Sequence, residues 1–113
     1  MLALRNRLKR QRDFENVFKT GKGFKQSSLY LKFQKNDLES TRFGFIVSKK
    51  FSKKAVERNR AKRVLREIIK IELPKIKTGL DIVILVNPET EIDFEKLQKT
   101  INILFKKAGI LWK

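Results

Sequence analysis

The sequence contains no cysteine and no histidine. Disulfides and thiolate metal sites are therefore excluded, as are cysteine nucleophiles and acid–base catalysis by histidine. The five glycines and two prolines are scattered, and no phosphate-binding loop or dinucleotide-binding fingerprint occurs. The longest apolar run, Ile82–Val86, is far too short to span a bilayer. The chain thus shows no sign of an autonomous active site.

Acidic residues are scarce. Lysine and arginine total 28 against 12 aspartates and glutamates, which gives a formal net charge of +16. Such a charge repels itself in a compact chain, so it indicates a polyanionic partner. Nucleic acid is the first candidate and an anionic membrane surface the second. The first ten residues lack the apolar stretch of a signal peptide, and we expect a soluble, cytoplasmic protein without a membrane partner.

The chain has enough apolar material for one core. Its 113 residues are 41% hydrophobic and include nine phenylalanines, which predicts a single folded domain over residues 1–113. Apolar spacing and turn residues predict the order helix, strand, strand, helix, strand, helix. The expected helices are Leu8–Thr20, about Lys53–Leu73, and a last helix from the Asp93 cap to Gly109; the expected strands are Ser28–Gln34, Arg42–Ser48 and Asp81–Asn87, with a further short strand near Phe24.

This order of elements predicts an α+β sandwich, in which helices pack on one small sheet. Ser28–Gln34 and Arg42–Ser48 are expected to form an antiparallel hairpin. The continuous apolar run in Asp81–Asn87 is typical of a central strand covered on both faces. In the last helix we expect a buried stripe of Phe94, Leu97, Ile101, Leu104, Phe105 and Ala108.

The long helix carries the densest charge, over residues 53–67. When its residues are placed about 100° apart, an apolar arc forms that should dock on the sheet, comprising Ala61, Val64, Leu65, Ile68 and Ile71. The opposite arc holds Asn59, Lys62, Arg63, Arg66 and Lys70. A solvated face normally mixes charge signs, whereas here like charges lie four residues apart and cations crowd the helix start against the helix dipole. Phosphate binding therefore explains this face better than solvation does.

A second candidate surface combines aromatic and cationic side chains. Phe14 and Phe18 lie four residues apart on the first helix, and Tyr30 and Lys32 share the polar face of the first long strand. Rings beside cations suit single-stranded nucleic acid, although a phenylalanine pair at helical spacing is more often core.

An acidic cluster of Glu89, Glu91 and Asp93 could hold a hard cation such as Mg²⁺. A solvated turn followed by a helix cap explains the same residues better.

Residues 55–67 resemble the Arg-Asn-Arg signature of the bacterial ribonuclease P protein component. The segments 13–21, 43–50 and 81–85 resemble further parts of that family in the same order, so the resemblance covers nearly the whole chain. It implies a ribosomal-protein-like sandwich of a four-stranded sheet and three helices. It also implies a left-handed strand–helix–strand crossover around the signature helix, where the usual sense is right-handed.

The resemblance implies the function as well. A protein of this family joins a catalytic RNA to form an endoribonuclease that removes the 5′ leader from precursor tRNA. The catalytic centre and the Mg²⁺ requirement belong to the RNA, so no catalytic residue, metal or cofactor is expected in the protein itself. Its expected partners are the catalytic RNA and precursor tRNA, with a monomeric protein in the ribonucleoprotein.

The resemblance also distributes the candidate residues between the two RNAs. Contacts to the catalytic RNA would come from Arg58, Asn59, Arg60, Arg63, Lys49, Lys50 and Lys53. Contacts to the leader would come from Phe14, Phe18, Tyr30, Lys32, Lys62 and Arg66.

The chain departs from the family at two places. Lys32 stands where the family tends to have an aromatic, with Tyr30 on the same face, and the loop at 50–55 is longer than usual. The alternative function is a non-enzymatic RNA-binding module such as a ribosomal protein. A duplex DNA binder with the cationic helix in the major groove is a third interpretation.

Overall fold

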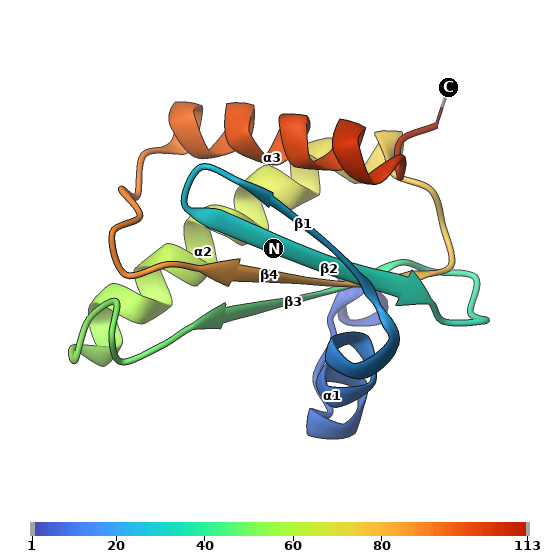
Figure 1. Cartoon of the computed structure of the whole chain (residues 1–113), viewed down its shortest axis with the longest axis horizontal. Helices are drawn as coiled ribbons and strands as arrows, with labels where there is room; N and C mark the ends of the chain where they lie inside the picture. The colour runs from blue at the N-terminus through green and yellow to red at the C-terminus, as the bar shows by residue number, and fades with distance from the viewer. Residues whose placement is uncertain (1, 113) are drawn as a thin grey trace.

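A four-stranded sheet with helices on both faces organises the protein, as the computed structural model shows (Figure 1). The structure describes residues 2–112. In chain order its elements are η1 (Leu4–Asn6), α1 (Gln11–Thr20), β1 (Lys22–Gln26), β2 (Leu29–Lys35), β3 (Arg42–Val47), α2 (Ala55–Glu72), η2 (Leu73–Lys75), β4 (Leu80–Val86) and α3 (Phe94–Ala108). The α+β class is confirmed, and the short strand expected near Phe24 is β1.

The strand order is β1-β2-β4-β3. β4 pairs antiparallel with β2 and parallel with β3. The expected hairpin between β2 and β3 is therefore wrong, because β4 lies between them. The loop after β2 lies beside the start of β4: the backbone amide of Asn36 donates to the Gly79 carbonyl at 3.0 Å, just before β4 begins. The β3–α2–β4 connection joins parallel strands, and its left-handed sense stays a prediction.

The two faces of the sheet have separate cores. α2 and α3 cover one face, where Leu31, Phe43 and Ile84 point into the larger cluster. α1 covers the other face, where Leu8, Val17 and Val83 form a smaller cluster. Figure 1 shows α1 on the opposite side of the sheet from α3. Every residue of β4 except Leu85 is buried, which confirms the expected central strand covered on both faces.

The helix boundaries follow local hydrogen bonding. α1 begins at Gln11 rather than Leu8, because the Leu8 amide donates to the Phe43 carbonyl at 2.8 Å and residues 7 and 8 run along the edge strand. α2 begins at Ala55, two residues later than expected. In α3 the predicted ends are confirmed. Asp93 Oδ1 accepts from the Lys96 amide at 3.0 Å, and Gly109 adopts the left-handed φ of 70° at the stop.

The buried side of α2 is rotated from the predicted arc. Ala61, Leu65 and Ile68 are buried as expected, together with Ile69 and Glu72, which were not in that arc. Ile71 was predicted to be buried and is 53% exposed. The rotation has a tertiary cause, since α3 packs over the Ile69–Glu72 side and Gln98 Nε2 donates to Glu72 Oε1 at 3.0 Å.

Phe94 is a second correction. It was placed in the buried stripe of α3, but as the first residue of that helix it is 39% exposed. Leu97, Ile101, Leu104 and Phe105 are buried as predicted, and Ala108 packs against the core in a half-buried position.

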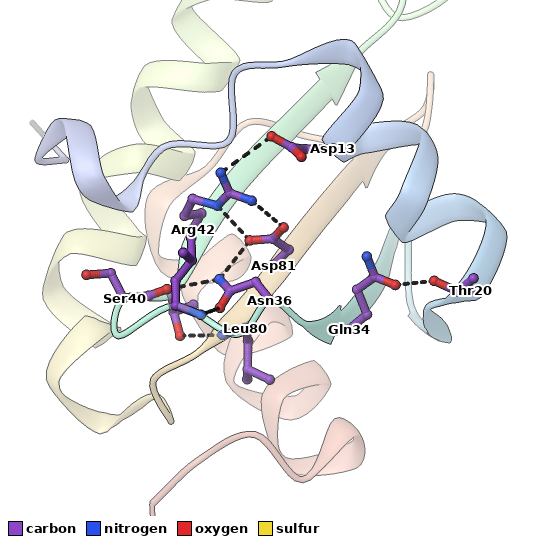
Figure 2. Close-up of polar contacts among 10 residues, drawn as sticks. Asp13, Thr20, Gln34, Asn36, Ser40, Arg42, Leu80 and Asp81 are labelled. Carbon is purple, nitrogen blue, oxygen red and sulfur yellow. Dashed lines mark hydrogen bonds and ion pairs between the residues drawn. The ribbon is translucent and has the colours of Figure 1, made fainter.

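One polar network ties α1, β3 and β4 together (Figure 2). Arg42 donates from Nε and Nη2 to the two carboxylate oxygens of Asp81 at 2.8 and 2.6 Å. The same guanidinium reaches Asp13 of α1 at 3.4 Å, and Asn36 Nδ2 donates to Asp81 at 2.9 Å. The hydrogen bond to Asp81 raises the pKa of Arg42 above its ordinary value. Asp81 is only 3% exposed, so this bidentate pair satisfies a carboxylate that is removed from water.

We expect Asp81→Asn to lower the free energy of unfolding by about 3 kcal/mol, because Arg42 loses its bidentate carboxylate partner and keeps the longer 3.4 Å contact to Asp13. Urea denaturation followed by circular dichroism measures the loss. Asp37→Asn is the matched control, because Asp37 is exposed and asparagine also tolerates its positive φ of 61°. The control should stay within about 0.5 kcal/mol of the parent. Equal effects of the two substitutions would contradict a structural role for the Arg42–Asp81 pair.

Candidate nucleic-acid interface

The cations of α2 divide into two sets that face different parts of the molecule. Lys62 and Arg66 are half-buried and turn toward β3 and the N-terminal segment. Asn59, Arg60 and Arg63 are exposed. The single cationic arc predicted for this helix therefore meets different neighbours on its two sides. Arg66 borders both sides, because it also lines a hollow with Asn59 and Arg63.

The loop before α2 adds cations to the start of the helix. Lys49, Lys50 and Lys53 are exposed there. Arg58 holds this loop in place, because its Nη1 donates to the Ser52 carbonyl at 2.8 Å. Arg58 is half-buried as a result, so part of its hydrogen-bonding capacity is used within the protein.

A cavity of about 260 Å³ lies where α1, β3 and α2 approach one another. Phe14 of α1 and the cations Lys62 and Arg66 of α2 meet in its lining across Gly44 of β3. The remaining lining comes from Leu2, Arg7, Leu8, Lys9, Phe43 and Phe45. Three of the residues predicted to contact the leader are thus brought together by elements far apart in the sequence.

Gly44 is required for this arrangement. A Cβ atom at this position would overlap the ring of Phe14 and come within 3.3 Å of the Leu8 Cβ. The absent side chain lets the Phe14 ring pack directly on the backbone of β3. Sequence reasoning missed the role of Gly44, and an isolated glycine inside a strand was the available signal for close approach. It also missed Arg7 and Lys9, whose sequence context gave no such signal.

Phe18 and Lys32 form a second contact between α1 and the sheet. Lys32 Nζ donates to the Phe18 carbonyl at 2.8 Å and lies 5.6 Å from the centre of the Phe18 ring. This ammonium group satisfies a carbonyl in the last turn of α1, where cations are favourable. Thr20 and Gln34 also make a side-chain contact at this end of the helix (Figure 2).

Of the two candidates on β2, Tyr30 is the one with a ring. Its hydroxyl lies over Gly23, where a Cβ atom would displace it. Lys25, Leu85 and Asn87 line the same shallow hollow beside the ring. Lys32 is engaged with α1, whereas Tyr30 borders open space, so the geometry favours Tyr30 as the stacking residue.

Phe14 and Phe18 are both half-buried. They pack against the cluster of Leu8, Val17 and Val83, yet each keeps part of its ring accessible. Phe14 and Phe18 are therefore partly core residues and partly available as stacking surfaces for bases. Partial exposure is what the family resemblance favours.

The acidic cluster has local functions. Asp93 caps α3, and Glu91 accepts from Lys96 Nζ at 2.9 Å, which raises the pKa of Lys96. Among residues 2–112, no group of three acidic, cysteine or histidine side chains is placed to hold a metal ion. Within the same part of the chain, none of the helices is both long and apolar enough for a transmembrane span.

Comparison with known proteins identifies the family. Residues 2–109 match the family described as Ribonuclease P. The chain belongs to the ribonuclease P protein family. The ribonuclease P protein component of Synechocystis is 39% identical over 107 residues, which cover 93% of this chain and 86% of that protein. The component from Thermotoga maritima is 35% identical over 111 residues, or 93% and 94% of the two chains.

Solved ribonuclease P protein structures share the fold. The Thermotoga maritima protein superposes with a TM-score of 0.79 at 34% identity and covers 88% of this chain and 96% of its own. The Staphylococcus aureus protein has a TM-score of 0.83 at 25% identity, over 95% and 98% of the two chains. The predicted function as the protein subunit of ribonuclease P, a tRNA-processing endonuclease complex, is confirmed, and the ribonuclease P RNA is its partner. The ribosomal-protein alternative gains no support.

We expect Gly44→Ala to lower the free energy of unfolding by about 1–3 kcal/mol, because the added methyl overlaps the Phe14 ring. In the Phe14→Ala background the same substitution should cost at least about 1 kcal/mol less, since the overlapping ring is gone. A double-mutant cycle in urea measures this coupling. The control pairs Gly44→Ala with Ile103→Ala on the exposed side of α3, where effects should add within about 0.5 kcal/mol. Additivity in both cycles would contradict direct packing of Phe14 on residue 44.

Proposed function

We propose that the protein grips the two RNAs of ribonuclease P on separate surfaces. The leader groove, by which we mean the cavity where α1, β3 and α2 meet together with the rings of Phe18 and Tyr30, holds the 5′ leader of precursor tRNA. The exposed side of α2 holds the catalytic RNA, which carries the catalytic centre. The observation that carries this proposal is the cavity in which Phe14 meets Lys62 and Arg66 across Gly44.

The groove has the composition that single-stranded RNA requires. Rings provide stacking surfaces for bases, and cations beside them follow the phosphates. Phe14, Phe18 and Tyr30 supply rings on one face of the sheet, and Lys62 and Arg66 supply the cations at its β3 edge. Lys32 contributes by holding the end of α1 against β2, which keeps the Phe18 ring in position.

The exposed side of α2 suits a folded RNA. Arg60 and Arg63 present planar guanidinium groups that bind phosphates bidentately, and the neighbouring Asn59 can bond a base edge or a ribose hydroxyl. Lys49, Lys50 and Lys53 extend this charge beyond the helix start. Arg58 supports the surface by holding the loop that carries these lysines.

In this proposal the protein contributes binding and orientation, while the RNA supplies Mg²⁺ and the hydrolytic chemistry. Holding the leader fixes the precursor relative to the catalytic RNA. Less entropy is then lost on the way to the transition state, so cleavage is faster. The protein acts as a monomer within the ribonucleoprotein and works in the cytoplasm.

The proposal predicts a gain in function on reconstitution. Adding the protein to its catalytic RNA at low Mg²⁺ should raise cleavage of precursor tRNA by about tenfold or more, because even one stacked base contributes about 1–3 kcal/mol. Single-turnover cleavage of an end-labelled precursor measures the gain.

Two controls accompany this assay. The protein alone should leave the precursor intact, and Arg60→Ala should require a higher protein concentration for the same cleavage because it loses a phosphate contact. An unchanged cleavage rate with and without the protein would refute the proposal.

The leader contact predicts a substrate-selective effect of Tyr30. Tyr30→Leu should weaken binding of leader-carrying precursor to the reconstituted enzyme by about 5- to 150-fold, since it removes one stacking surface. Tyr30→Phe keeps the ring and should bind like the parent. Equilibrium binding of precursors with and without a leader separates the contributions. An equal loss for leaderless tRNA would show that Tyr30 acts only in the fold.

A further inference from the structure

A second hollow lies on the outer side of the protein, between α2 and the start of α3. It measures about 510 Å³ and is lined by Arg60, Arg63, Val64, Glu67, Ile71 and Phe94. It shares no lining residue with the cavity of Phe14, Lys62 and Arg66. The hollow is therefore a surface distinct from the proposed leader groove.

The floor of this hollow is apolar. Ile71 is 53% exposed and Phe94 is 39% exposed, although the periodicity of both helices predicted them to be core residues. Exposed apolar side chains that gather in one place commonly mark an interaction site. Half-buried Val64 lies one turn from Arg60 and joins the floor to the arginines.

The rim of the hollow carries two cations and one acid, a net positive charge. Arg60, Arg63 and Glu67 are all exposed, and the hollow continues directly from the side of α2 proposed to bind the catalytic RNA. An aromatic ring that shares a hollow with two guanidinium groups suits a nucleobase, since the ring can stack on the base and the arginines can hold the adjacent phosphates.

We propose that this hollow receives an unpaired base of the catalytic RNA, stacked on Phe94 between the two arginines. The inference rests on the proposed function, because it takes the catalytic RNA as the partner on this side of α2. Phosphate contacts alone position an RNA without identifying a particular nucleotide. A base seated against Phe94 defines which nucleotide lies at the end of the cationic surface.

Charge favours RNA over a second copy of the chain as the occupant. A symmetric dimer places the same patch of both subunits face to face. Such a contact would bring Arg60 and Arg63 against their counterparts in a protein whose net charge is already +16. An RNA strand instead neutralises the same arginines.

The test exploits the different salt dependence of stacking and phosphate binding. Phe94→Leu should weaken binding of the full-length catalytic RNA by about 5- to 150-fold and leave the slope of log K against log salt unchanged, because it removes a ring and no charge. Arg60→Ala should lower the magnitude of that slope by about one. Filter binding without precursor tRNA, across a series of salt concentrations, measures both quantities.

Two further variants keep the result specific. Phe94→Trp retains an aromatic surface and should bind like the parent. Ile103→Ala changes a residue of the same helix with a similar exposed fraction of 42%, and it should also bind like the parent. Thermal unfolding of each variant establishes that the weakened form remains folded at the assay temperature.

Three results would overturn the inference. If Phe94→Leu binds the RNA like the parent protein does, the hollow receives no base, while the proposed function stands. If Phe94→Leu instead changes a concentration-dependent dimerisation in sedimentation equilibrium, a second copy is the occupant. If the parent protein fails to bind the catalytic RNA, the proposed function fails as well, so the two failures are distinguishable.

Discussion

The burial of β4 on both faces is the constraint on which the rest of the structure depends. This strand pairs with β2 on one side and β3 on the other, and its side chains alternate between the two cores. A strand of this composition loses its stabilisation if either face is exposed, because nearly all of its side chains are apolar. It therefore holds α1 on one face and α2 with α3 on the other. The acid near its start, Asp81, is buried with its carboxylate paired to Arg42 and hydrogen-bonded to Asn36.

The central position of β4 leaves β3 at the edge of the sheet, and this edge is where the two halves of the interface meet. α1 reaches β3 from one face and α2 from the other, so Phe14 and the pair Lys62 and Arg66 converge on Gly44. The N-terminal segment runs along the same edge through the hydrogen bond from Leu8 to Phe43, which covers backbone groups that would otherwise be open to another strand. The cavity proposed to hold the leader is thus built where an edge strand meets two helices.

Local patterns predicted local structure well. The Asp93 cap, the Gly109 stop and the central strand expected over Asp81–Asn87 all follow from short-range rules. The cap and the stop are confirmed, and the strand runs over Leu80–Val86. The pairing of β3 was predicted wrongly because a short connection favours a hairpin, whereas the partner that displaces β2 lies 39 residues further along the chain, as in the pair Arg42 and Asp81. Ile71 and Phe94 were predicted wrongly for a related reason, since helical periodicity says which residues share a side but not which part of that side a neighbour covers.

The sequence by itself determined the excess of cations, the amphipathic α2 and the resemblance to the ribonuclease P family, because each is carried by composition or by residues close together in the chain. The tertiary structure alone decided how the cations divide, since Lys62 and Arg66 face β3 while Arg60 and Arg63 remain exposed. It also gave Tyr30 and Lys32 different surroundings. Both side chains lie on the same face of β2. The packing of α1 brings the Phe18 carbonyl to Lys32, whose ammonium group donates to it, while the Tyr30 ring lines a shallow hollow. Exposure is a property of what a distant segment covers, and the chain acquires that property only when it folds.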